Sequence, residues 1–287
     1  MRKLLVFVAV GILTLSLAAP ARAASILFVG NSFTFADLSD VKHYRPESVH
    51  DLNNEGIGGV PALFKGFTVQ AHLDFDVSLE TSPGKNFDFH LQQKTAVLDR
   101  PWDHVLLQGY STLDAHKPGD PALLVDYTGR LAKLFEAKNP RVDIRLVSTW
   151  SRADQTYSST GHWHGKSIDV MATDIRAAYD QAATTSPAIH SVIPVGQAWN
   201  RAIVSHLATA NPYTAAPKGE IDLWATDHYH GSTYGYYLEA LVIFGNVTGR
   251  DPRMLGSHEQ AAAALGIEPS LASKLQQIAA ETLAAEK

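Results

Sequence analysis

The chain has 287 residues, of which 45% are hydrophobic and 18% charged, a balance typical of a globular protein large enough to bury a substantial core. Its formal net charge of -5 excludes the basic bias expected of a nucleic-acid-binding protein. The absence of cysteine excludes a cysteine nucleophile, a lipoprotein anchor and a disulfide framework.

The N-terminus has the pattern of an export signal. Arg2 and Lys3 precede an apolar stretch at 4–17, and the tripeptide Ala-Arg-Ala at 21–23 fits a cleavage site after Ala23. The alternative, an uncut membrane anchor, is disfavoured because the apolar stretch is too short to span a bilayer comfortably. We therefore predict a signal peptide at 1–23 and a secreted or periplasmic bacterial protein without stable membrane insertion.

Apolar runs of strand length alternate with segments of helical periodicity along the rest of the chain. Strands are predicted at 26–29, 75–79, 104–107, 144–148 and 191–195. Helices are predicted at 123–137, 166–185, 238–244 and 271–285, the last with Ser270 as its N-cap. This alternation predicts a single α/β domain over 24–287, a three-layer sandwich with a five-stranded, mainly parallel sheet.

The segment 35–59 departs from this regular alternation. It is polar and contains three glycines in its last four positions. It reads as an insertion after the first strand, either a lid over the carboxyl edge of the sheet or a surface excursion.

Three residues have the chemistry of a serine hydrolase. The strand at 26–29 runs into Gly30-Asn31-Ser32, which places one serine at the carboxyl edge of the sheet. Far downstream, Asp227 and His230 supply a carboxylate and an imidazole three residues apart. Ser32 is therefore the predicted nucleophile, His230 its base and Asp227 the residue that orients the base.

These two blocks resemble those of the SGNH (GDSL-like) hydrolase superfamily, with Asn31 in place of the family's aspartate. The resemblance implies an oxyanion hole formed by the Ser32 N–H, a glycine after the second strand and a carboxamide after the third. Gly84 and Gln108 are the matching residues. The run from Gln108 to Ser111, Gln-Gly-Tyr-Ser, lacks the family's usual asparagine but is similar to the Gln-Gly-Glu-Ser of sialate and xylan acetylesterases.

Several residues around these blocks are candidate substrate contacts. They are Asn31, Tyr110, Trp150, His162, His164 and His228. Trp150 and Trp199 would either stack on a sugar ring or pack in the core. The pairs His162/His164 and His228/His230 also allow a zinc site to be drawn with a nearby aspartate, but the flanking glycines favour a loop that lines the cleft. No metal or cofactor is expected.

Together these features predict an exported serine hydrolase that removes O-acyl groups, most simply acetyl, from a carbohydrate or another small ester. A short-chain lipid esterase or thioesterase and a periplasmic O-acetyltransferase are alternatives with the same acyl-enzyme. A non-catalytic glycan-binding protein is the alternative from another class, because fold does not settle function. The sequence leaves the oligomeric state open.

Overall fold

The structure, a computed structural model, describes residues 22–286. The predicted signal peptide therefore lies outside the described residues except for its last two positions. Within the described part of the chain, no helix combines the length and apolar character needed to cross a bilayer.

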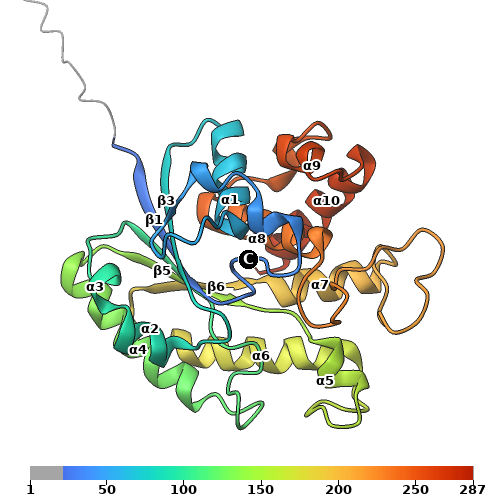
Figure 1. Cartoon of the computed structure of the whole chain (residues 1–287), viewed down its shortest axis with the longest axis horizontal. Coiled ribbons are helices and arrows are strands. Elements are labelled where there is room, and N and C mark those ends of the chain that lie inside the picture. Colours follow the sequence, from blue (N-terminus) through green and yellow to red (C-terminus); the bar gives the residue numbers. More distant parts are fainter. Residues whose placement is uncertain (1–21, 287) are drawn as a thin grey trace, which may run out of the picture.

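The centre of the molecule is a six-stranded parallel sheet with strand order β2-β3-β1-β4-β5-β6 (Figure 1). The strands are β1 (Ala24–Gly30), β2 (His50–Asp51), β3 (Phe75–Thr81), β4 (His104–Leu107), β5 (Asp143–Ser148) and β6 (Ile189–Pro194). The five predicted strands are all present. The sixth, β2, has only two residues and pairs with β3 at the edge of the sheet. Two residues are too few to show a periodic pattern, so the sequence does not predict this strand.

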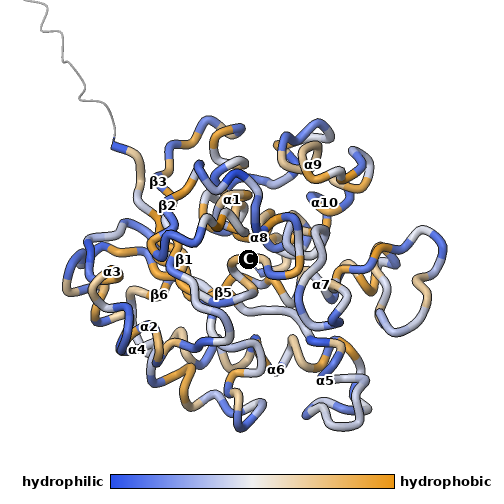
Figure 2. The backbone as a smooth tube through the Cα atoms, in the orientation of Figure 1, coloured by the Kyte–Doolittle hydropathy of each residue, from blue (hydrophilic) through white to orange (hydrophobic). Residues whose placement is uncertain are grey.

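Helices cover both faces of the sheet, as a buried parallel sheet requires (Figure 1). Ile26 and Phe28 of β1 pack into one apolar cluster, while Leu27 and Val29 pack into the other. This alternation follows from the two-residue period of a strand and explains why all four positions are apolar. Figure 2 accordingly shows apolar residues concentrated on the central strands and polar residues in the outer loops.

One layer contains α1, α7, α8 and α10, and the other contains α2, α4 and α6. The helices are α1 (Gly59–Gln70), α2 (Phe87–Gln93), α3 (Thr95–Leu98), α4 (Ala122–Lys138), α5 (Ala153–Tyr157), α6 (Ile168–Ala183), α7 (Val195–Val204), α8 (Thr233–Thr248), α9 (Gln260–Ala264) and α10 (Pro269–Ala285). Short 3-10 turns lie at η1 (Asp40–His43), η2 (Pro46–Ser48) and η3 (Pro252–Leu255). The prediction that Ser270 caps the last helix is wrong, because α10 begins at Pro269 with Glu268 in the N-cap position. Proline suits that first helical position, where no N–H donor is needed.

The segment 35–59 is folded against the body of the protein. Phe35, Val41 and Ile57 are buried in the same apolar cluster as α1 and α8. The Val60 N–H donates to the Thr34 carbonyl at 3.1 Å, which ties the start of α1 to the residues that follow β1. Its apolar side chains thus contribute to the core, which a simple surface excursion would not.

Candidate functional site

The candidate site lies at the carboxyl edge of the sheet, where β1 and β4 are neighbours. After β1 the chain crosses to β2, on the β3 side of the sheet, whereas after β4 it continues to β5 on the other side. Open α/β sheets bind ligands where the strand order reverses in this way. Ser32 follows β1 and Gln108 follows β4, so two of the predicted residues meet here.

The Gln108 side chain holds the loop that carries Ser32 through two hydrogen bonds. Gln108 Oε1 accepts hydrogen bonds from the Asn31 N–H at 3.1 Å and from the Thr34 hydroxyl at 3.0 Å. A Cβ atom at Gly30 would lie 2.1 Å from Thr34 Oγ1 and 2.9 Å from Gln108 Oε1, so only glycine fits there. This packing sets the direction in which the chain turns off β1.

The Asn31 side chain braces the same loop against its neighbours. Its Nδ2 donates to the Lys85 carbonyl at 3.0 Å and to the Gly109 carbonyl at 3.1 Å, while its Oδ1 accepts from the Phe33 N–H at 3.2 Å. Asn31 is only 2% exposed. Both of its amide hydrogens are therefore engaged, and its prediction as a substrate contact is replaced by a positioning role.

Of the two polar backbone groups of Ser32, only the carbonyl is hydrogen-bonded. Its carbonyl accepts from the Asp37 N–H at 3.0 Å and from the hydroxyl of buried Tyr236, in α8, at 3.3 Å. Among residues 22–286, no hydrogen bond involves the Ser32 N–H. A free backbone N–H of this kind can stabilise an oxyanion.

The Asp227 and His230 side chains form a charge-assisted pair. His230 Nδ1 lies 2.6 Å from Asp227 Oδ2, and Asp227 Oδ1 accepts from the N–H groups of Tyr229 and His230 at 3.1 and 3.0 Å. Burial by itself would raise the pKa of Asp227, but these hydrogen bonds lower it below its ordinary value. His228 has a left-handed backbone, φ 58°, which turns the chain so that the carboxylate can reach both N–H groups.

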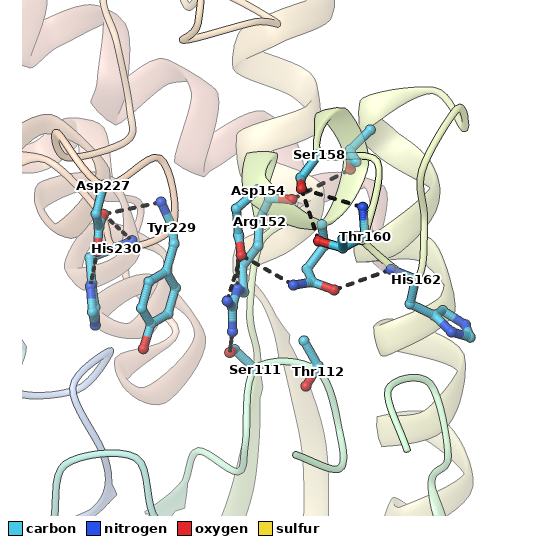
Figure 3. A network of polar contacts seen from close by, with 12 residues as sticks. Ser111, Thr112, Arg152, Asp154, Ser158, Thr160, His162, Asp227, Tyr229 and His230 are labelled. Atoms are coloured by element: carbon cyan, nitrogen blue, oxygen red, sulfur yellow. Dashed lines mark hydrogen bonds and ion pairs between the residues drawn. The ribbon is translucent and has the colours of Figure 1, made fainter. Parts of the chain in front are cut away.

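The His230 side chain is held through one of its two ring nitrogens. Its Nδ1 is bound to Asp227, and its Nε2 is buried with no hydrogen-bond partner among the described residues (Figure 3). The ring lies 5.6 Å from that of Phe33, the residue after Ser32. The His230 ring therefore lies beside the loop that carries Ser32, although no hydrogen bond joins these two side chains in this structure. Such bonds are often long before substrate binds.

A second polar group, centred on Arg152 after β5, lies beside this pair (Figure 3). Arg152 donates from Nε and Nη2 to the Asp154 carboxylate at 3.0 and 2.7 Å and from Nη1 to Ser111 at 3.2 Å. Its guanidinium lies 3.9 Å from the centre of the Tyr229 ring, and that ring lies 3.7 Å from the His230 ring. Sequence reasoning missed Arg152 and Tyr229. Their positions directly after a strand and inside the Asp227–His230 block were the available signals.

The tryptophan prediction is corrected by the structure. Trp150 is fully buried and stacks on Trp199, with ring centres 4.4 Å apart and planes 2° from parallel. Both rings belong to the core, so neither is available to a sugar. The Trp150 Nε1 donates to the Tyr229 carbonyl at 3.2 Å, which gives it a supporting role instead.

His162, on the loop after α5, lies away from the Asp227–His230 pair. His162 and His164 are exposed, and Figure 3 shows the His162 ring beyond Arg152 and Asp154, on the side opposite His230. The His162 ring rests near Gly119. His162 is therefore separated from that pair by Arg152 and Asp154, and the lining role predicted for His162 and His164 stays a prediction. Among the described residues, no group of three or more histidines and carboxylates is placed to hold a metal ion.

The remaining predicted residues, Gly84, Tyr110 and His228, lie nearer the protein surface. Gly84 is at an exposed turn with φ 65°, and it lines a surface depression with Tyr110 and His116. The His228 ring packs 4.1 Å from that of Tyr213, a residue that is 49% exposed on the loop after α7. Tyr213 is therefore an exposed aromatic beside the Asp227–His230 block, a position that sequence reasoning did not single out.

Comparison with known proteins gives matches in structure only: no family model and no curated protein matches the chain. A DUF4886 family protein from Bacteroides uniformis superposes with TM-score 0.58 and 17% identity over 92% of this chain and 95% of its own. A protein described as a GDSL-like lipase from Parabacteroides merdae gives TM-score 0.51 and 15% identity over 79% and 96%. A Clostridium thermocellum family 3 carbohydrate esterase gives 0.51 and 14% over 82% and 99%.

These likenesses establish the architecture. The chain shares the fold of these solved structures, a GDSL-like lipase and a carbohydrate esterase among them, so the predicted α/β fold class is confirmed. The one difference is the number of strands, six where five were predicted.

Proposed function

We propose that this protein is an exported serine ester hydrolase of the SGNH type. The observation that carries the proposal is the Asp227–His230 pair at 2.6 Å, whose imidazole has a free, buried Nε2 and lies beside the loop that carries Ser32. A histidine oriented by a carboxylate and left with one unpaired nitrogen is arranged to take a proton from a serine hydroxyl. The GDSL-like and carbohydrate esterase neighbours in structure are consistent with this chemistry.

The reaction follows from these roles. Ser32 Oγ forms a bond to the acyl carbon as its proton passes to His230 Nε2, and the carbonyl oxygen takes the negative charge. Collapse of this intermediate breaks the bond to the alcohol oxygen, which receives the proton from His230. Water then repeats the sequence on the acyl-enzyme and releases the acid. Asp227 stabilises the imidazolium in both steps.

For the substrate we propose an O-acyl group, most simply acetyl, on a carbohydrate. Exposed Tyr213 supports this choice, because an aromatic face at the rim of a polar site is a surface on which a sugar ring can stack. It takes the place of the tryptophans that the fold buries. The two catalytic alternatives keep Ser32 as the nucleophile. A lipid esterase or thioesterase would prefer a different acyl chain, and an O-acetyltransferase would use a sugar hydroxyl in place of water.

The test of the reaction is release of p-nitrophenol from acetate, butyrate and octanoate esters. Ser32→Ala should abolish release without changing the unfolding temperature. Ser148→Ala is the matched control, because it removes a buried serine hydroxyl at the end of β5, where that hydroxyl donates only to the Ile193 carbonyl at 3.0 Å. Release that survives in Ser32→Ala would exclude Ser32 as the nucleophile. No release by the folded wild type would favour the transferase or the non-catalytic reading.

The test of the substrate uses Tyr213→Ala. Hydrolysis of p-nitrophenyl acetate should be unchanged, because the hydroxyls and imidazole of the reaction are untouched. KM for an acetylated xylo-oligosaccharide should rise about tenfold, which corresponds to about 1.4 kcal/mol of lost stacking. An unchanged KM would remove Tyr213 from the substrate site, and a preference for octanoate would favour a lipid ester.

A further inference from the structure

Hydrolysis at Ser32 requires hydrogen-bond donors for the oxyanion, and most donors near Ser32 are already engaged. The N–H groups of Asn31 and Phe33 bind side-chain oxygens of Gln108 and Asn31. After β4, the Gly109 N–H binds the Tyr179 hydroxyl at 2.8 Å and the Tyr110 N–H binds Asn86 Oδ1 at 3.1 Å. Of the five backbone N–H groups at Asn31, Ser32, Phe33, Gly109 and Tyr110, that of Ser32 has no partner, and one backbone donor leaves a tetrahedral oxyanion incompletely solvated.

The Gln108 amide oxygen and one of the two amide hydrogens are used to hold the loop that carries Ser32. The amide oxygen faces Asn31 and Thr34, and the amide nitrogen donates to the Gly109 carbonyl. Exchanging the two amide atoms would set a donor against the Asn31 N–H and an acceptor against the Gly109 carbonyl, so the orientation is determined.

The Tyr229 side chain is held at the nucleophile from three sides. Its ring lies between the Arg152 guanidinium, 3.9 Å from the ring centre, and the His230 ring at 3.7 Å, and it also contacts the Phe33 ring at 5.5 Å. Figure 3 shows its hydroxyl at the same end as the tip of the His230 imidazole. The Tyr229 backbone is fixed as well, through the Asp227 carboxylate and the Trp150 indole.

The electrostatic surroundings favour this hydroxyl as a donor. Burial raises the pKa of Tyr229, while a hydrogen bond with the Ser32 side chain and the positive charge of Arg152 act to lower it. The phenol therefore stays protonated at neutral pH, and the adjacent cation increases its strength as a hydrogen-bond donor. Arg152 itself is anchored by Asp154 and Ser111, so its position is set before substrate binds.

From these contacts we propose that the Tyr229 hydroxyl is the side-chain donor of the oxyanion hole, completing the site with the Ser32 N–H. The hydroxyl donates a hydrogen bond to the carbonyl oxygen as Ser32 Oγ attacks, and no proton is transferred to that oxygen. Arg152 acts through Tyr229 as a positioning residue. This inference rests on the proposed hydrolase function, and it assigns Tyr229 a role instead of Gln108.

The experiment compares Tyr229→Phe with wild type in steady-state hydrolysis of p-nitrophenyl acetate. Phenylalanine keeps the ring between Arg152 and His230 and removes only the donor. We expect kcat to fall on the order of 10²-fold with KM changed less than threefold, as for other lost oxyanion donors. Tyr127→Phe is the matched control, because the hydroxyl of Tyr127, in α4, only accepts an exposed hydrogen bond from Gln92 of α2. Its kcat should equal that of wild type.

A second variant tests whether Arg152 acts by positioning Tyr229 or only by stabilising the fold. Arg152→Met keeps a long side chain against the ring but removes the charge and the anchor. We expect kcat to fall in the wild-type background and to change little further when Tyr229 is already phenylalanine, because both changes act through one hydrogen bond. Unfolding temperatures of all variants are measured alongside, and fully additive losses would overturn the role of Arg152.

The outcomes distinguish this inference from the function on which it rests. If wild type shows no release that depends on Ser32, the hydrolase proposal fails. If release depends on Ser32 but Tyr229→Phe retains kcat within twofold of wild type, the hydrolase stands and Tyr229 is not a donor. A higher kcat in Tyr229→Phe would also overturn the inference, since it would mean that the hydroxyl only restrains Ser32 at rest.

Discussion

The Gln108 amide offers a quantitative test of how the nucleophile loop is held. Gln108→Leu keeps the size of the side chain and removes the oxygen that accepts from the Asn31 N–H and the Thr34 hydroxyl. Gln108, Asn31 and Thr34 are all less than 5% exposed, so water cannot replace the lost acceptor. Each stranded donor costs about 1–3 kcal/mol, which predicts a loss of about 2–6 kcal/mol in the free energy of unfolding.

Thr34→Val provides the graded comparison. It removes one of the two hydrogen bonds and leaves Gln108 bound to Asn31, so the expected loss is about 1 kcal/mol. The assay is urea denaturation followed by tryptophan fluorescence, with midpoint and slope both fitted. For Gln108→Leu, kcat measured on folded protein should also fall, because Asn31 directly precedes Ser32.

Two results would refute this reasoning. If Gln108→Leu were no less stable than Thr34→Val, the amide oxygen would not be the brace that its contacts indicate. If stability were unchanged while kcat alone fell by 10² or more, Gln108 would be acting on the oxyanion, as the sequence first suggested.

Three further changes test other parts of the structure. Trp150→Phe should lower the unfolding free energy by roughly 1–3 kcal/mol and leave KM for sugar esters within twofold, since its ring is in the core; a large rise in KM would contradict this. Gly30→Ala should cost about 1–3 kcal/mol and most of the activity, because its Cβ would meet Thr34 Oγ1 at 2.1 Å; a stable, active variant would show that the loop has room. Asp143→Asn tests an ion pair at the start of β5. Although burial would raise the pKa of Asp143, hydrogen bonds from His104 and Arg145 lower it well below its usual range, so the carboxylate stabilises the fold above about pH 4 and loses this effect at lower pH. In urea titrations Asp143→Asn should have a lower free energy of unfolding than wild type at pH 6, and this difference should shrink below about pH 4. A difference that stays constant with pH would count against the ion pair.

The positions of the five longer strands could be predicted from the chain because they depend on local patterns. Four apolar residues at 26–29 can only be buried on both faces, and Gly30 marks the turn that follows them. The two-residue strand β2 was missed because its polar residues pair only with β3 at the sheet edge.

The roles of the surrounding residues required the tertiary structure. Trp150 occupies a strand end, where sequence allows either a core or a binding position, and only its stacking on Trp199 decided between them. Gln108 meets Asn31 across 77 residues of chain, and Arg152 meets Tyr229 in the same way through space.

The sequence by itself therefore determined the fold class, and it singled out Ser32, His230 and Asp227 as the candidates for nucleophile, base and acid. The tertiary structure decided which other polar groups remain free to act on the substrate. That depends on how many hydrogen bonds each group makes to distant parts of the chain, and no local pattern records such contacts.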